Sequence, residues 1–217
     1  MTYNELVTAV SDYSENTFPT SVMNTMIKQA EQRIYNTVQI ANLRKNVTGS
    51  LSAGNKYLSC PGDFLSVYSL AIYPAAGGDY EYLLDKDVNF IRQAYPNQTT
   101  QGKPKHYAIF GPQSADSNEL TFIVGPTPNA AYGAELHYYY YPESIVTAGE
   151  TWLGDNFDSA LLNGTMVEAI TYMKGEETMV KLYAERYLSS IALLKNLGDG
   201  KQRGDAYRNG QVRVKVN

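Results

Sequence analysis

Apolar side chains recur at helical spacing through the first 40 residues. Thr2 and Glu5 match a capping box directly before the apolar positions begin. A longer amphipathic segment follows Pro19, a residue that suits the start of a helix. Its apolar positions are Val22, Met26, Ile27, Ala30, Ile34 and Val38, with Asn24, Lys28, Glu31 and Gln32 on the other side. The pattern predicts two N-terminal helices.

From about residue 41 the helical period gives way to short β-favouring runs separated by turn residues. The expected strands cover residues 43–49, 57–58, 64–73, 80–84, 106–110, 120–124 and 134–141, with a small helix at 87–95. The runs 106–110 and 120–124 are predicted to pair as a hairpin. Aromatic residues fall on both faces of 134–141, which predicts a strand that is covered on each side.

The helical period returns at residue 156, first to residue 173 and then from 176 to 197, where Gly198 is expected to end the last helix. Beyond it we expect a mobile linker and then an alternating segment that could add as a strand to a partner. The fold class is therefore α+β: an antiparallel helical bundle made from N- and C-terminal helices, with an inserted antiparallel β-rich domain and an extended C-terminal tail. The expected boundaries are 1–40 with 150–197 for the bundle, 41–149 for the insertion and 198–217 for the tail.

Charge separates the C-terminal tail from the rest of the chain. The whole chain carries −4, but residues 201–217 hold five cations and one aspartate, so this segment is +4 and the remainder is −8. Such a balance argues against general nucleic-acid binding, which depends on clustered cations. The N-terminus has no secretory pattern and no apolar run is long enough for a membrane span, so we expect a protein made in a cytoplasm, with no membrane partner.

Few residues offer chemistry. Cys60 is the single cysteine, and neither His106 nor His137 stands at a spacing typical of metal ligands or of a nucleophile and its base. We therefore expect no enzyme activity, no cofactor and no metal. Tyrosine is abundant, at 19 residues, and suits both sheet packing and contacts between subunits.

Several sequence landmarks occur in one order along most of the chain. They are residues 27–34 (IKQAEQRI), 58–65 (LSCPGDFL), 102–109 (GKPKHYAI), 124–128 (VGPTP), 138–142 (YYYYP), 152–153 (WL) and 158–162 (DSALL). In this order and spacing the chain resembles the head-to-tail adaptors of short-tailed bacteriophages, the tail tubular protein A family.

The resemblance implies a structural subunit of the virion, assembled in the host cytoplasm. Copies would form a ring, a dodecamer in that family, below the portal protein and above the tail nozzle protein. DNA would pass through the channel of the ring without specific binding, and an acidic wall would let it slide.

The basic tail is the expected portal-binding segment. The residues that we assign to this role are Lys201, Arg203, Tyr207, Arg208, Val212, Arg213, Val214 and Lys215. An alternative of another class is a carbohydrate- or receptor-binding tail module, in which Tyr80, Tyr82, Tyr138 and Tyr140 would form a stacking platform for sugars.

Overall fold

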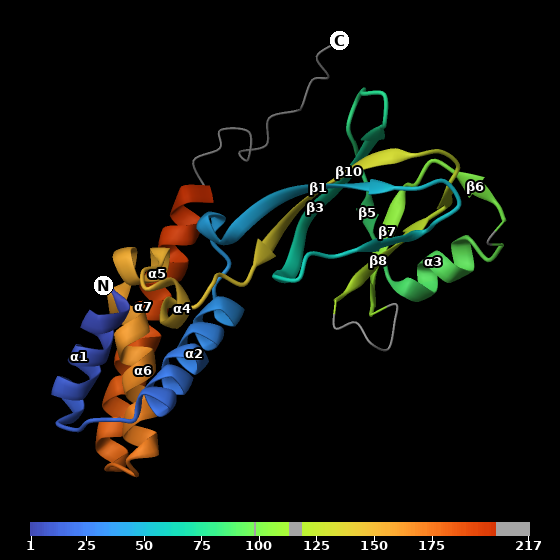
Figure 1. Ribbon diagram of the computed structural model, residues 1–217. Helices are drawn as coiled ribbons and strands as arrows, with labels where there is room; N and C mark the ends of the chain where they lie inside the picture. Colours follow the sequence, from blue (N-terminus) through green and yellow to red (C-terminus); the bar gives the residue numbers. More distant parts are fainter. Residues whose placement is uncertain (98, 113–118, 203–217) are drawn as a thin grey trace. The chain divides into compact units, whose positions relative to one another are not determined.

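The computed structural model describes residues 1–97, 99–112 and 119–202, with side chains up to Leu197 (Figure 1). The chain is α+β, as predicted, and divides into two compact units. The helical unit comprises Met1–Asn42 and the described residues from Pro142 onward, and the β unit comprises Leu43–Tyr141.

Helix α6 is the centre of the helical unit. It packs against α1, α2 and α7, and Figure 1 shows these helices side by side. The helices of this unit are α1 (Tyr3–Ser14), α2 (Thr20–Thr37), α4 (Ile145–Ala148), α5 (Trp152–Asn156), α6 (Asp158–Tyr172) and α7 (Glu177–Gln202). A short 3-10 turn, Ala41–Leu43, follows α2.

Gly164 of α6 lets three helices approach closely. A Cβ atom at this position would lie 3.3 Å from the side chains of both Ala30 in α2 and Tyr187 in α7.

The predicted capping box of the first helix is confirmed: Thr2 accepts from the backbone N–H of Glu5, and the Glu5 side chain accepts from the backbone N–H of Thr2. The amphipathic pattern thus found the core face of these helices.

Two expectations for the helical unit are wrong. Gly198 does not end the last helix, because α7 continues through Gly198 and Gly200 to Gln202; each glycine inside a helix costs only about 1 kcal/mol relative to alanine. Glu31, expected on the polar face of α2, is buried at 2% exposure. Its carboxylate accepts a hydrogen bond from the backbone N–H of Ile145 at 2.8 Å, which compensates for the burial.

The β unit contains two four-stranded sheets and a two-stranded one. Its elements are β1 (Arg44–Leu51), β2 (Tyr57–Ser59), β3 (Phe64–Pro74), β4 (Glu81–Tyr82), β5 (Leu84–Asp85), α3 (Val88–Ala94), β6 (Gln101–Gly102), β7 (His106–Gly111), β8 (Thr121–Gly125), β9 (Thr127–Pro128) and β10 (Tyr132–Tyr140). The sheet orders are β1-β10-β3-β4, β2-β8-β7-β5 and β6-β9.

Strand pairing agrees with the sequence pattern in the long strands and departs from it in the short ones. The β7–β8 hairpin is antiparallel, as predicted, and β10 lies between β1 and β3. Tyr138 and Tyr139 are both buried, so both faces of β10 are covered. The pairs β5–β7 and β6–β9 are parallel, however, so the insertion is not wholly antiparallel.

Aromatic rings fill the core of the β unit. Phe122 is fully buried, and its ring lies 5.6 Å from that of Phe64 and 5.7 Å from that of Tyr107, both edge to face. Phe64 also stacks on Tyr138 at 6.0 Å. Such pairs contribute beyond the area that they bury, and they join the two larger sheets into one core.

Candidate functional site

The predicted portal-binding segment starts where the described residues end. Lys201 belongs to the last turn of α7. The other assigned residues, Arg203, Tyr207, Arg208, Val212, Arg213, Val214 and Lys215, lie outside the described residues. Portal binding by this segment therefore stays a prediction.

The four tyrosines of the predicted sugar platform are not brought together on the surface. Tyr138 is 3% exposed, and its hydroxyl donates to the Asp63 carboxylate at 2.8 Å. Tyr140 is half-buried, with the Lys45 ammonium 4.1 Å from its ring centre. Tyr80 and Tyr82 alone present exposed rings.

Tyr80, Tyr82 and Leu84 form an exposed apolar row in the β unit, with exposures of 50, 66 and 60%. They alternate along an extended segment, whereas Leu83 between them is buried. The ring of Tyr80 packs against that of Tyr73, with the ring centres 4.9 Å apart. Because β4 is an edge strand, this row is suited to contact with another protein.

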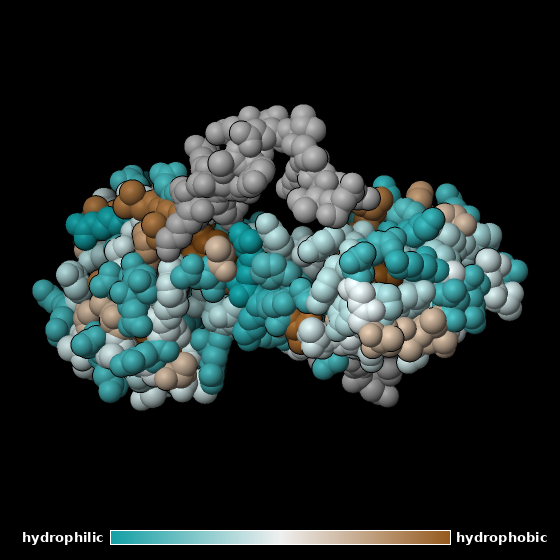
Figure 2. All heavy atoms as spheres, turned by 90° about the horizontal axis from the view of Figure 1, so that it is seen from above, coloured by the Kyte–Doolittle hydropathy of each residue, from teal (hydrophilic) through white to brown (hydrophobic). Residues whose placement is uncertain are grey.

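Helix α7 carries a second exposed apolar row beside its buried face. The row consists of Met179, Leu182, Leu193 and Leu197, which recur on one side of the helix. Arg186 is the one charged residue on that strip among the described residues of α7, and it packs over the ring of Tyr183. In Figure 2 brown, hydrophobic residues reach the surface in small patches on both units.

A groove of about 480 Å³ lies between α2 and α6. Val22 and Met26 from α2 face Thr171 and Tyr172 from α6 across it. It lies on different helices from the α7 row, so the helical unit offers two dissimilar surfaces.

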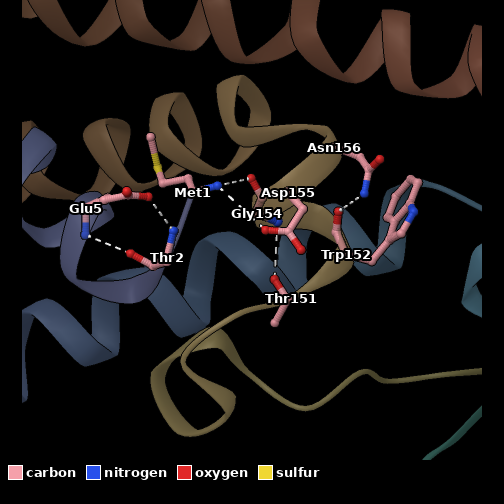
Figure 3. Close-up of polar contacts among 8 residues, drawn as sticks. All are labelled: Met1, Thr2, Glu5, Thr151, Trp152, Gly154, Asp155 and Asn156. Atoms are coloured by element: carbon pink, nitrogen blue, oxygen red, sulfur yellow. Dashed lines mark hydrogen bonds and ion pairs between the residues drawn. The ribbon is translucent and has the colours of Figure 1, made fainter.

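The N-terminus is fixed by a small polar cluster (Figure 3). The amine of Met1 donates to the carbonyl of Gly154 at 2.7 Å and lies 3.8 Å from the Asp155 carboxylate. A Cβ atom at Gly154 would lie 2.4 Å from the Met1 carbonyl oxygen, so the close approach requires glycine. The Thr151 hydroxyl caps α5 by accepting from the Gly154 N–H. The first residue of the chain thus anchors the segment that leads back into α6.

Burial shifts the pKa values of titratable groups in the β unit. Burial raises the pKa of the Cys60 thiol to about 12, which leaves it a thiol at neutral pH. Burial and neighbouring cations lower the pKa values of His106 and His137, which favours neutral rings at neutral pH. Within the described ranges no group of three or more His, Cys, Asp or Glu residues is placed to hold a metal ion.

A family match over nearly the whole of this two-unit chain places it in the class of structural adaptor proteins of phage particles. The family model described as SU10 adaptor protein matches residues 1–215, and the chain belongs to that family. The match confirms the resemblance to phage head-to-tail adaptors. No curated protein matches the chain.

Family membership makes the protein a structural component of the virion. Across the described part of the chain, no helix has both the length and the apolar character to cross a membrane.

Proposed function

We propose that the protein is the repeating subunit of a ring in the neck of a short-tailed phage, which joins the portal to the tail nozzle and continues the DNA channel. The family match over residues 1–215 carries this proposal, because it covers both units rather than one module. The subunit acts without a cofactor, and its binding energy comes from packing against neighbours.

The surfaces of the helical unit support a ring. A ring of identical subunits needs a contact between two different patches, because a patch that pairs with itself closes a dimer. The α7 row and the α2–α6 groove are two such patches. Twelve copies of a 24.1 kDa chain would have a mass of about 290 kDa.

The C-terminal segment supplies the portal contact in this proposal. Lys201, Arg203, Arg208, Arg213 and Lys215 give it a charge opposite to that of the chain as a whole. Such a segment, at the end of a long helix, suits a reach toward an acidic groove or a sheet edge on the portal.

An acidic helical unit suits a part of the channel wall along which DNA slides. Residues 1–42 and 142–197 carry twelve carboxylates and six Lys or Arg residues. In the proposed ring these carboxylates line part of the channel and repel the phosphate backbone.

Light scattering with negative-stain imaging tests the ring. The purified protein is measured alone and after mixing with portal rings. We expect a ring, or a monomer that assembles on the portal. A monomer that ignores the portal would refute the proposal.

Truncation after Gln202 tests the tail. The shortened chain keeps the whole of α7 and loses the remaining assigned residues. We expect ring contacts to survive and portal affinity to fall at least tenfold, the equivalent of about 1.4 kcal/mol. A scrambled tail of the same composition is the control, because it separates charge from sequence. Unchanged portal affinity after truncation would exclude the tail as the docking segment.

A further inference from the structure

The seven Lys and Arg residues of the β unit fall into two groups. Lys45 pairs with Asp63 at 2.7 Å, Lys103 pairs with Glu81, and the Arg44 guanidinium packs over the rings of Tyr68 and Tyr139. The other four are Lys56, Lys86, Arg92 and Lys105. Within the described residues no carboxylate lies within 4.0 Å of any of these four.

These four cations are gathered around α3 and one end of the β7–β8 hairpin. The carbonyl of Lys56 accepts from Val124 N–H at 2.9 Å, and the N–H of Lys105 donates to the Gly125 carbonyl at 2.9 Å. The N–H of Lys86 donates to Tyr107 of β7, at 2.8 Å. The fourth cation is carried by α3, which packs on β7 and β8.

Aromatic rings support three of the four cations. Lys56 Nζ lies 5.5 Å from the ring centre of Tyr57, and Lys86 Nζ lies 5.4 Å from that of Phe90. The Arg92 guanidinium carbon lies 5.4 Å from the ring centre of Phe110. These contacts hold the cations in place without neutralising their charge.

Two of these cations line a pocket of about 270 Å³. Besides Lys56 and Arg92, the lining residues include Tyr57, Tyr95 and Thr127, together with Ile91, Ile123 and Val124. The pocket therefore combines two cations with hydroxyl-bearing and aliphatic residues.

Tyr95 is held rigidly at the wall of the pocket. Its hydroxyl oxygen lies 2.9 Å from His106 Nδ1, and its ring packs so closely on Gly125 that a Cβ atom there would lie 2.4 Å from it. The pKa of His106 is lowered by burial and then by the nearby charges of Lys86 and Lys105. A nearby carboxylate, that of Asp87, is engaged in capping α3 by accepting from Asn89 N–H.

We propose that this surface, defined by Lys56, Lys86, Arg92 and Lys105, binds the phosphodiester backbone of DNA. The pocket between Lys56 and Arg92 takes one phosphate, and the other two lysines contact further phosphates. Several separate cations around one helix suit a ligand with repeated charges better than a single carboxylate. Contact with DNA inside a neck ring rests on the proposed function, but the binding itself does not.

The salt dependence of DNA binding tests this assignment. A fluorescently labelled short duplex is titrated with the full chain, by anisotropy, at several NaCl concentrations. Each phosphate neutralised on duplex DNA adds about −0.9 to the slope of log K against log salt. We expect K56Q/R92Q to reduce the steepness of that slope by about 1.8, and to weaken binding at least tenfold in low salt.

The matched control is K28Q/K195Q, which removes the same charge from two exposed lysines of the helical unit. The basic tail is identical in both variants, so its own binding cancels. We expect the control to keep the wild-type slope. Equal loss of slope in both variants would show that net charge alone matters, and would overturn the assignment.

Two competitors identify the ligand class. Neither polyglutamate nor inorganic phosphate, at matched ionic strength, should displace the duplex better than chloride does. Efficient displacement by polyglutamate would make this a surface for acidic protein. Efficient displacement by inorganic phosphate would make it a single-phosphate site, and either result would overturn the DNA assignment. Light scattering on the same variants reports ring formation separately, so failure of the ring and failure of DNA binding are distinguished.

Discussion

The two units differ in the side chains that they bury and in the balance of their charged residues. The helical unit packs mostly aliphatic side chains around α6 and buries the carboxylate of Glu31. The β unit packs phenylalanine and tyrosine rings around Phe122. Carboxylates outnumber cations twelve to six in residues 1–42 and 142–197, but only eight to seven in residues 43–141. One chain thus presents an acidic surface and a nearly balanced one, which suits it to unlike neighbours.

Each unit contains a natural probe. The single tryptophan, Trp152, lies in α5 of the helical unit, and the single cysteine, Cys60, is buried in the β unit. Tryptophan fluorescence therefore reports unfolding of the helical unit. Thiol labelling reports opening of the β unit, because a buried thiol with a pKa of about 12 does not react until it is exposed.

The largest expected effect is in the aromatic core. Phe122→Ala removes a fully buried ring that touches Phe64 and Tyr107, and should destabilise the β unit by about 3–5 kcal/mol. Labelling of Cys60 should then accelerate by about a hundredfold to a few thousandfold, at about 1.4 kcal/mol per factor of ten. The fluorescence transition of Trp152 should move much less.

Ile109→Ala is the matched control. Ile109 is paired with Phe122 in the register of β7 and β8, but its side chain is exposed. Its expected cost is within about 0.5 kcal/mol. If Phe122→Ala shifted both probes equally, the two units would unfold as one, and the comparison between them would fail.

A smaller effect is expected at the buried carboxylate. Glu31→Ala leaves the Ile145 N–H without its acceptor and should cost the helical unit about 1–3 kcal/mol, measured by urea unfolding at Trp152. Glu31→Gln keeps an oxygen acceptor and should cost less. A loss for the Gln variant as large as that for Ala would mean that the charge, not the hydrogen bond, matters.

The same site predicts a pH dependence. Burial is the main cause of the raised pKa of Glu31. Below about pH 4.5 the Glu31 carboxyl is protonated in both the folded and the unfolded chain. As the pH rises above this value, the unfolded chain ionises first. The folded state therefore loses stability as the pH rises through the raised pKa of the folded state. Glu31→Gln cannot ionise, so it should gain stability relative to the wild type from pH 4 to 7. A constant difference across that range would contradict the raised pKa.

The smallest effect is expected at an exposed ion pair. Lys181 and Glu177 pair at 2.6 Å on α7, but both side chains are largely exposed. Lys181→Gln should change the stability of the helical unit by no more than about 0.5 kcal/mol, a change that salt should abolish. A larger loss of stability that does not depend on salt would show that this pair stabilises α7 more than exposed ion pairs normally do.

The sequence was most informative where periodicity was long. Capping at Thr2, the amphipathic face of α2 and the β7–β8 hairpin follow from local patterns, and the structure has all three. The pairing of β5 with β7 leaves no such signal, because β5 has only two residues and is too short to show a period.

The features that the sequence did not predict correctly have physical reasons. Glu31 looked like a surface carboxylate because its partner, Ile145, lies 114 residues away. Tyr138 looked available to a sugar, but Asp63 satisfies its hydroxyl within the core. The cations around α3 come from three separate segments, so their convergence is visible only after folding.

The order of the units along the chain has a consequence for synthesis. Helices α1 and α2 are translated first, but their main packing partner, α6, begins at Asp158, after the whole β unit has been made. The N-terminal helices must therefore wait for a distant segment, and such long-range closure is slow. A ribosome-bound chain therefore cannot complete the packing of its helical unit until α6 and α7 have been made.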